Sequence, residues 1–132
     1  LIRAHSEEAD PARLCVGLGW EAYPEGLYLC LKRLWRELGL PIFITENGIG
    51  TDDDRWRQEF LLQHLRQVLR AIKEGVPVKG YFHWSFIDNF EWAEGYAPRF
   101  GLVSCNRETL ERRIKDSGYL YAKIVQNNTL PV

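Results

Sequence analysis

One carboxylate near the middle of the chain has the position expected of a catalytic group. Glu46 directly follows the apolar run Ile42–Thr45 and directly precedes Asn47-Gly48. In a parallel α/β barrel the catalytic residues lie at the carboxyl ends of the strands, and the tight turn behind Glu46 would leave its side chain pointing into a site. Two structural roles fit the same residue, a solvated loop carboxylate or a cap of the helix that begins near Asp52.

A second group of polar residues lies among aromatic side chains between His83 and Phe100. This mixture fits carbohydrate, because sugar rings present apolar C–H faces to indoles and hydroxyl groups to carboxylates. It also fits an aromatic core with buried, hydrogen-bonded polar groups. We assign three phenylalanines mainly to packing, Phe82, Phe86 and Phe90. An unpaired buried Glu91 would be costly without a ligand or partner, so we assign three residues to the site, Trp84, Glu91 and Trp92.

Helices and strands alternate along the chain and would position these residues. Apolar residues at three- and four-residue spacing predict a helix from Pro24 to Gly39, a second from Asp52–Asp54 to Gly75–Pro77, and a third that Ser117 caps. The second helix would bury one apolar stripe, Trp56, Phe60, Leu61, Leu65, Val68, Leu69 and Ile72. We interpret residues 1–19 as a loop, 42–45 and 78–86 as strands, 87–100 as a loop and 101–104 as a short extended piece.

The alternation of strands and helices indicates βαβ units and a parallel sheet. Two parallel strands cannot cover the apolar stripes of these helices, and they leave unpaired sheet edges. We therefore expect the sheet to continue in residues that this chain does not contain.

Composition excludes several classes of function. The net charge is −1, whereas binding to nucleic acid or to an anionic membrane surface requires clustered positive charge. No run approaches the ~18 apolar residues of a membrane helix. The chain has three cysteines, Cys15, Cys30 and Cys105, and no two of them have metal or redox spacing. We therefore expect buried free thiols and a reducing compartment, in keeping with a cytoplasmic protein. The histidines are scattered, and we expect no metal and no organic cofactor; His5 fits a surface, His64 a helix face and His83 a buried strand.

Both motifs resemble the C-terminal part of glycoside hydrolase family 1, the β-glucosidases and β-galactosidases. The matching segments are Ile44-Thr45-Glu46-Asn47-Gly48 and Trp84-Ser85-Phe86-Ile87-Asp88-Asn89-Phe90-Glu91-Trp92, followed by Gly95-Tyr96 and Arg99-Phe100-Gly101-Leu102. Weaker similarities extend the match to about Gly17–Val125. The resemblance implies an α/β fold, the C-terminal part of a (β/α)₈ TIM barrel with about strands 7 and 8 and their flanking helices. Because a whole barrel takes ~250 residues, we expect residues 1–132 to be a C-terminal fragment of one barrel domain.

The resemblance also implies a reaction and roles for five residues. Glu46 matches the catalytic nucleophile of a retaining β-glycosidase, which attacks the anomeric carbon while a second carboxylic acid protonates the leaving oxygen. Glu91 and Trp92 match residues that bind the outer hydroxyls of the nonreducing sugar. Trp84 matches the stacking platform beneath that sugar, and Phe100 matches a wall of the same subsite. In the family the second carboxylate lies in an Asn-Glu-Pro segment, and this sequence contains no such tripeptide.

Substrate and partners follow from the same comparison. Family members that act on 6-phosphorylated sugars depart from the Glu91-Trp92 pair, so an unphosphorylated β-glycoside is expected. The expected protein partner is the N-terminal remainder of the same barrel, without which we expect the chain to be inactive and poorly soluble. The alternative hypothesis is a non-catalytic sugar-binding or scaffold fragment that lacks the acid/base residue.

Overall fold

The structure is a computed structural model, and it describes residues 15–16 and 19–131. Three helices and two parallel strands form its main body: α1 (Pro24–Leu38), β3 (Ile42–Asn47), α2 (Asp54–Lys73), β4 (Val78–His83) and α3 (Asp116–Asn127). Two small antiparallel pairs accompany them, β1 (Cys15–Val16) with β2 (Trp20–Glu21), and β5 (Val103–Cys105) with β6 (Arg112–Ile114). A single turn of 3₁₀ helix, Trp92–Glu94, interrupts the long loop after β4.

The predicted boundaries of the first two helices are confirmed. Pro24 occupies the first turn of α1, and Gly39 ends it with φ of 64°, a left-handed conformation that glycine adopts without a steric penalty. The side chain of Asp53 caps α2 by accepting the backbone N–H of Arg55 at 3.0 Å. Local sequence signals therefore set both helices.

Three predicted elements differ from the observed ones. Of the predicted loop over residues 1–19, Cys15–Val16 forms β1, and 1–14 and 17–18 lie outside the described residues. The second strand ends at His83, not Phe86, because the backbone N–H of Ser85 turns to the carbonyl of Phe100. Ser117 does not cap α3: Lys115 holds the N-cap position, and the Ser117 hydroxyl donates to Asp54 instead. Strand β6, which the sequence did not predict, is exposed along its whole length and shows no alternating pattern.

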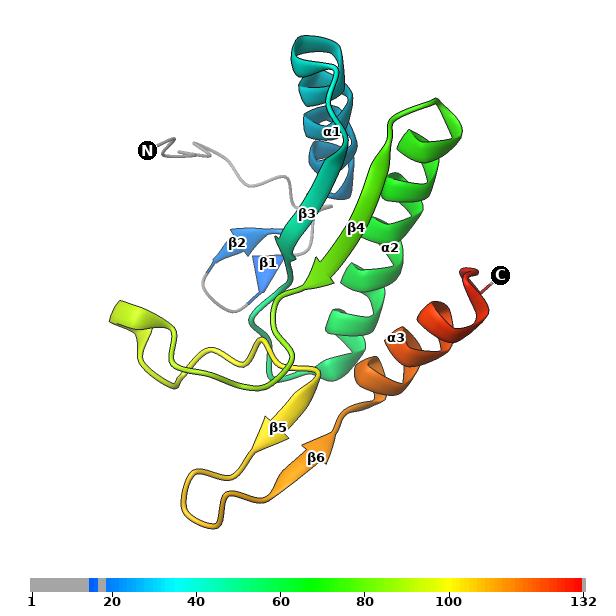
Figure 1. Cartoon of the computed structure of the whole chain (residues 1–132). Helices are drawn as coiled ribbons and strands as arrows, with labels where there is room; N and C mark the ends of the chain where they lie inside the picture. The colour runs from blue at the N-terminus through cyan, green and yellow to red at the C-terminus, as the bar shows by residue number, and fades with distance from the viewer. Residues whose placement is uncertain (1–14, 17–18, 132) are drawn as a thin grey trace.

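The core lies between the β3–β4 pair and the helices. α2 packs against α1 on one side and α3 on the other, and Figure 1 shows the three helices gathered along the two parallel strands. The buried cluster consists of Leu31, Ile44, Val68, Ala71 and Val76. Part of the predicted α2 stripe does not reach it, because Trp56, Leu69 and Ile72 are exposed.

The opposite face of the sheet is open among the described residues. Phe43 and Phe82 are 59% and 56% exposed, and Phe86 and Phe90 on the following loop are also exposed. Among the described residues Phe82, Phe86 and Phe90 are not part of the core, although the ring of Phe90 contacts that of Tyr96 at a centroid distance of 5.2 Å; their predicted packing role depends on what covers the open face and stays a prediction. The buried-thiol prediction is wrong for Cys30, which is exposed, and for Cys105, which is half-buried; the side chain of Cys15 is outside the described residues.

Candidate functional site

The carboxyl ends of β3 and β4 lie side by side and bring the two sequence motifs together. The strands are parallel, with Asn47 paired to His83, and the backbone N–H of Trp84 donates to the carbonyl of Asn47 at 3.0 Å. Both arrowheads point to the same end of the sheet in Figure 1. Glu46, which the sequence placed just after the strand, is its penultimate residue. The geometry therefore places Glu46 and Trp84 at one sheet edge.

Gly48 allows this close approach of the two motifs. A Cβ atom at Gly48 would lie 1.5 Å from the carbonyl oxygen of Trp84, where no side chain fits. The Trp84–Ser85 peptide bond beside it is cis. The glycine of the Asn47-Gly48 turn thus lets this backbone pack directly against the backbone of Trp84, behind Glu46.

Glu46 is exposed and has no hydrogen bond or ion pair from any residue within 15–16 or 19–131. A carboxylate of this kind is free to act on a molecule that binds beside it.

Trp84 and Glu91, both assigned to the site from sequence, contact each other directly. The indole Nε1–H of Trp84 donates to Oε1 of Glu91 at 3.0 Å, and both side chains are half-buried. The bond fixes the plane of the indole and leaves the second carboxylate oxygen of Glu91 available to an additional donor. This partner also resolves the cost that a buried, unpaired Glu91 would have carried.

Trp92 and Phe100 lie in contrasting environments. Trp92 has a φ of 52°, which is uncommon for an aromatic residue, and its side chain is 83% exposed. Phe100 is only 3% exposed; its ring lies against Gly50, and its centroid is 6.1 Å from that of Trp20. Trp92 is therefore open to a ligand, whereas Phe100 supports the loops from beneath.

Asp88 fixes the loop that carries Trp84 and Glu91. Its Oδ1 accepts the backbone N–H of Gly101 at 2.8 Å and the ammonium group of Lys115 at 2.9 Å. Burial lowers the pKa of Lys115, and the bond to Asp88 opposes this shift. The sequence motif contained Asp88, but its spacing alone did not distinguish a supporting carboxylate from a binding one.

Arg57 joins the loop after β3 to the loop after β4. It is fully buried, and its guanidinium donates to the carbonyls of Thr51 and Arg99 while pairing with Asp54. Asp54 also accepts the N–H and hydroxyl of Ser117, at 2.8 and 2.7 Å. Burial alone would raise the pKa of Asp54, but the hydrogen bonds from Ser117 and Arg57 outweigh it and lower the pKa. Sequence reasoning missed this cluster because an arginine in an amphipathic helix ordinarily faces water.

Two half-buried aromatic side chains lie behind the strand ends, His83 and Tyr81. Neither ring nitrogen of His83 has a hydrogen-bond partner among the described residues, and burial lowers its pKa to about 4. Tyr81 donates its hydroxyl to Oδ1 of Asn47 at 2.8 Å. His83 lies in a strand, as expected from the sequence, but is half-buried. His64 lies on a face of α2, as expected, and that face is buried, leaving His64 4% exposed.

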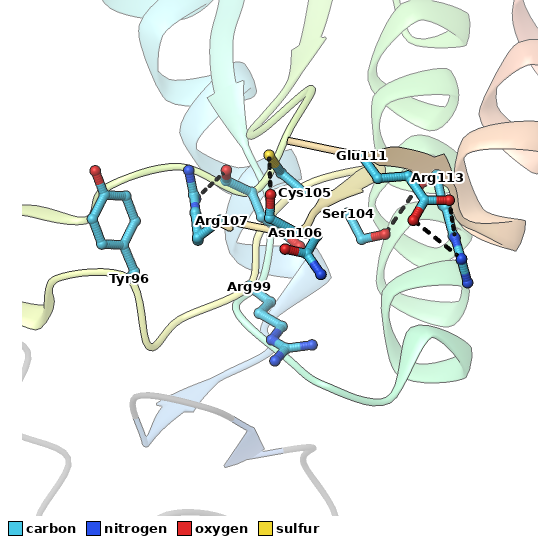
Figure 2. A pocket seen from close by; sticks show the side chains of 9 residues that line it. Tyr96, Arg99, Ser104, Cys105, Asn106, Arg107, Glu111 and Arg113 are labelled. Atoms are coloured by element: carbon cyan, nitrogen blue, oxygen red, sulfur yellow. Dashed lines mark hydrogen bonds and ion pairs between the residues drawn. The ribbon is translucent and has the colours of Figure 1, made fainter. Parts of the chain in front are cut away.

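A hollow of about 400 Å³ lies beside the β5–β6 hairpin, away from Glu46. Figure 2 shows Arg107 beside Tyr96 and the Glu111–Arg113 pair farther along its wall. Arg107 donates to the carbonyl of Asp88, with its guanidinium 4.2 Å from the Tyr96 ring centroid, and Arg113 pairs with Glu111. The contacts of Arg107 tie the hairpin to the site loop.

Two kinds of feature are absent from the described residues. These residues contain no group of three or more histidine, cysteine, aspartate or glutamate side chains arranged to hold a metal ion. No helix among them combines the length and the apolar character required to cross a membrane.

Comparison with known proteins identifies close relatives. The sequence model of Glycosyl hydrolase family 1 matches residues 2–130. β-Glucosidase A of Thermotoga maritima is 49% identical, with 86% of this chain and 28% of the relative aligned. A β-galactosidase of Sulfolobus acidocaldarius is 44% identical, with 86% of this chain and 23% of the relative aligned. The chain thus spans about a quarter of the length of these relatives.

Solved structures agree with the sequence match. The β-glycosidase from Pyrococcus horikoshii superposes with a TM-score of 0.90 at 48% identity, covering 94% of this chain and 29% of that one. The family 1 β-glucosidase from T. maritima in complex with isofagomine lactam gives 0.89 at 44% identity, covering 93% and 30%. The chain has the α/β fold of the C-terminal part of a (β/α)₈ barrel, and its described residues do not close a barrel.

Proposed function

Because the chain belongs to glycosyl hydrolase family 1, we propose that it supplies the nucleophile and the sugar subsite of a retaining β-glycosidase. The observation that carries the proposal is the exposed Glu46 carboxylate at the end of β3, next to the strand end from which Trp84 reaches Glu91. The curated relatives include β-glucosidases and β-galactosidases, so β-glycosides are the substrate class.

Each residue has a role in this proposal. Glu46 attacks the anomeric carbon and forms the glycosyl-enzyme, which water then hydrolyses. Trp84 stacks beneath the nonreducing sugar, with its plane fixed by the bond to Glu91. The free oxygen of Glu91 and the exposed edge of Trp92 bind hydroxyl groups, which favours an unphosphorylated sugar. Phe100, packed under the loops, supports the wall of the subsite from beneath.

The proton donor and the remaining strands come from the partner in this proposal. No Asn-Glu-Pro segment occurs in the sequence, and β3 and β4 pair only with each other among the described strands. The partner is the N-terminal remainder of the same barrel, which would cover the open face that carries Phe43 and Phe82 and supply donors to Glu46.

A chimeric barrel tests the proposal. Residues 2–130 replace the matching segment of T. maritima β-glucosidase A, and hydrolysis of an aryl β-glucoside is measured. We expect turnover in the chimera, loss of turnover in Glu46→Gln, and covalent labelling of the Glu46 peptide by a 2-deoxy-2-fluoro-β-glucoside.

Glu94→Gln is the matched control, because Glu94 is an exposed carboxylate of the same site loop to which we assign no role. It should retain turnover and labelling. The 132-residue chain alone should show neither. Labelling of another carboxylate would contradict the role of Glu46 as the nucleophile. Sugar binding by the chimera without turnover would contradict the enzyme and support a non-catalytic binding fragment.

A further inference from the structure

The end of β3 contains a β-bulge beside Glu46. Ile44 pairs with Tyr81 and Asn47 pairs with His83, so three steps along β3 oppose two along β4. In a regular strand, successive side chains alternate between faces, and Glu46 would share the helix-covered face with buried Ile44. Thr45 and Glu46 are instead both exposed, and Asn47 is half-buried. The bulge therefore re-aims Glu46 away from the helices, which is a recognised use of bulges near sites.

Asn47 holds the bulge in place from two directions. Its backbone carbonyl accepts the N–H of Trp84 at 3.0 Å, and its side-chain Oδ1 accepts the hydroxyl of Tyr81 at 2.8 Å. The first bond joins the two strand ends. The second bond fixes the side chain of Asn47 on the side of the strand where Tyr81 lies, which leaves Glu46 on the opposite side.

Tyr81 is itself immobilised. Its backbone carbonyl accepts the hydroxyl of Tyr121 from α3 at 3.1 Å, and the two rings meet edge to face at 6.2 Å. Burial raises the pKa of Tyr81 above its ordinary value. The phenol is therefore protonated at neutral pH and acts as the donor to Asn47.

We propose that Tyr81 is a positioning residue that aims the carboxylate of Glu46 by holding Asn47 and, with it, the β-bulge of β3. The inference rests on the proposed function, in which Glu46 is the nucleophile. Tyr81 does not touch the substrate in this arrangement. Its hydroxyl acts through Asn47 on the direction of the Glu46 side chain.

The test separates attack from binding in the chimeric barrel. Inactivation by the 2-deoxy-2-fluoro-β-glucoside gives a rate constant for attack by the nucleophile and an inhibition constant for binding. A misplacement of the order of 1 Å costs up to ~100-fold in rate, so Tyr81→Phe should lower the inactivation rate constant by ~10- to 100-fold. The inhibition constant should remain unchanged, because Trp84 and Glu91 are untouched.

Two other variants define the mechanism. Asn47→Ala should lower the same rate constant, and the double variant with Tyr81→Phe should be no slower than the slower single variant, since both act on one bond. Asn47→Ala also tests the proposal if Tyr81→Phe fails to fold. Tyr28→Phe is the matched control: it removes a hydroxyl that donates to Glu74, outside the strand ends, and should leave inactivation unchanged.

The outcomes distinguish the two proposals. Labelling of Glu46 in the parent chimera, with unchanged inactivation in Tyr81→Phe, overturns the positioning role and leaves the proposed function standing. Additive losses in the double variant also overturn it. Labelling of a different carboxylate in the parent overturns both proposals.

Discussion

The substitution Arg57→Met tests whether one buried guanidinium holds the two site loops together. Arg57 is fully buried, and it pairs with Asp54 while donating to the carbonyls of Thr51 and Arg99. Removing it leaves the carboxylate of Asp54 without its cation and the carbonyl of Thr51 without this donor. The site loops carrying Gly48 and Phe100 then lose the attachment that Arg57 provides, while the backbone hydrogen bond from the N–H of Thr51 to the carbonyl of Arg99 remains.

The expected cost follows from the burial of the pair. Removing one partner of a buried ion pair costs roughly 3–5 kcal/mol, because the other charge stays buried and uncompensated. Asp54 is 23% exposed and retains both hydrogen bonds from Ser117. We therefore expect the lower end, a loss of about 3 kcal/mol in the free energy of unfolding. The measurement is equilibrium urea unfolding of the chimeric barrel.

Two comparisons make the prediction strict. Arg55→Met removes the neighbouring arginine of the same helix turn, whose pair with Asp53 is exposed, and should cost only a small fraction as much. Adding Asp54→Asn to Arg57→Met should recover part of the loss, because no buried charge is then left unpaired. Equal losses for Arg55→Met and Arg57→Met, or no recovery in the double variant, would refute the reasoning.

Two other variants probe the strand ends. The folded-state pKa of His83 is about 4, below the ordinary 6.5. Because the unfolded state therefore binds a proton at higher pH than the folded state, the free energy of unfolding should fall as the pH drops from 6.5 toward 4, by up to ~1.4 kcal/mol per pH unit. His83→Leu should remove part of this pH dependence of urea unfolding. The part due to His64 should remain, because burial also lowers the pKa of His64. An unchanged pH dependence would contradict the lowered pKa of His83. Gly48→Ala forces a Cβ into the Trp84 carbonyl. It should lower the free energy of unfolding by ~1–3 kcal/mol or more and should also lower turnover. The control Gly39→Ala, strained but without a clash, should keep turnover, and equal turnover in the two would count against the close packing.

The main elements were predictable because their signals are local. Pro24, Gly39 and the three consecutive aspartates act on the backbone within a turn of their own positions. The apolar run 42–45 needed only its length and its branched side chains to indicate a strand. The position of Glu46 at the strand end followed directly, since it depends on where one strand stops.

Exposure was less predictable because it depends on distant residues. Phe82 and Phe86 belong to a residue type that usually lies in the core. Their exposure is nevertheless set by whatever faces the open side of the sheet. Strand β6 has no alternation, and it forms because backbone groups of Arg112–Ile114 meet those of Val103–Cys105. No periodicity within either segment records that pairing.

The supporting residues explain why the site itself was only partly predictable. Glu46 and Trp84 belong to recognisable motifs, but the direction of Glu46 depends on a bulge that Tyr81 and Asn47 hold across 34 residues of sequence. A strict two-residue alternation would have turned Glu46 into the helix-covered core, beside Ile44. The chain thus departs from the regular strand pattern at Glu46, the residue that we propose as the nucleophile. The half-buried phenol of Tyr81 and the amide of Asn47 stabilise this departure, and the motif marks neither as functional.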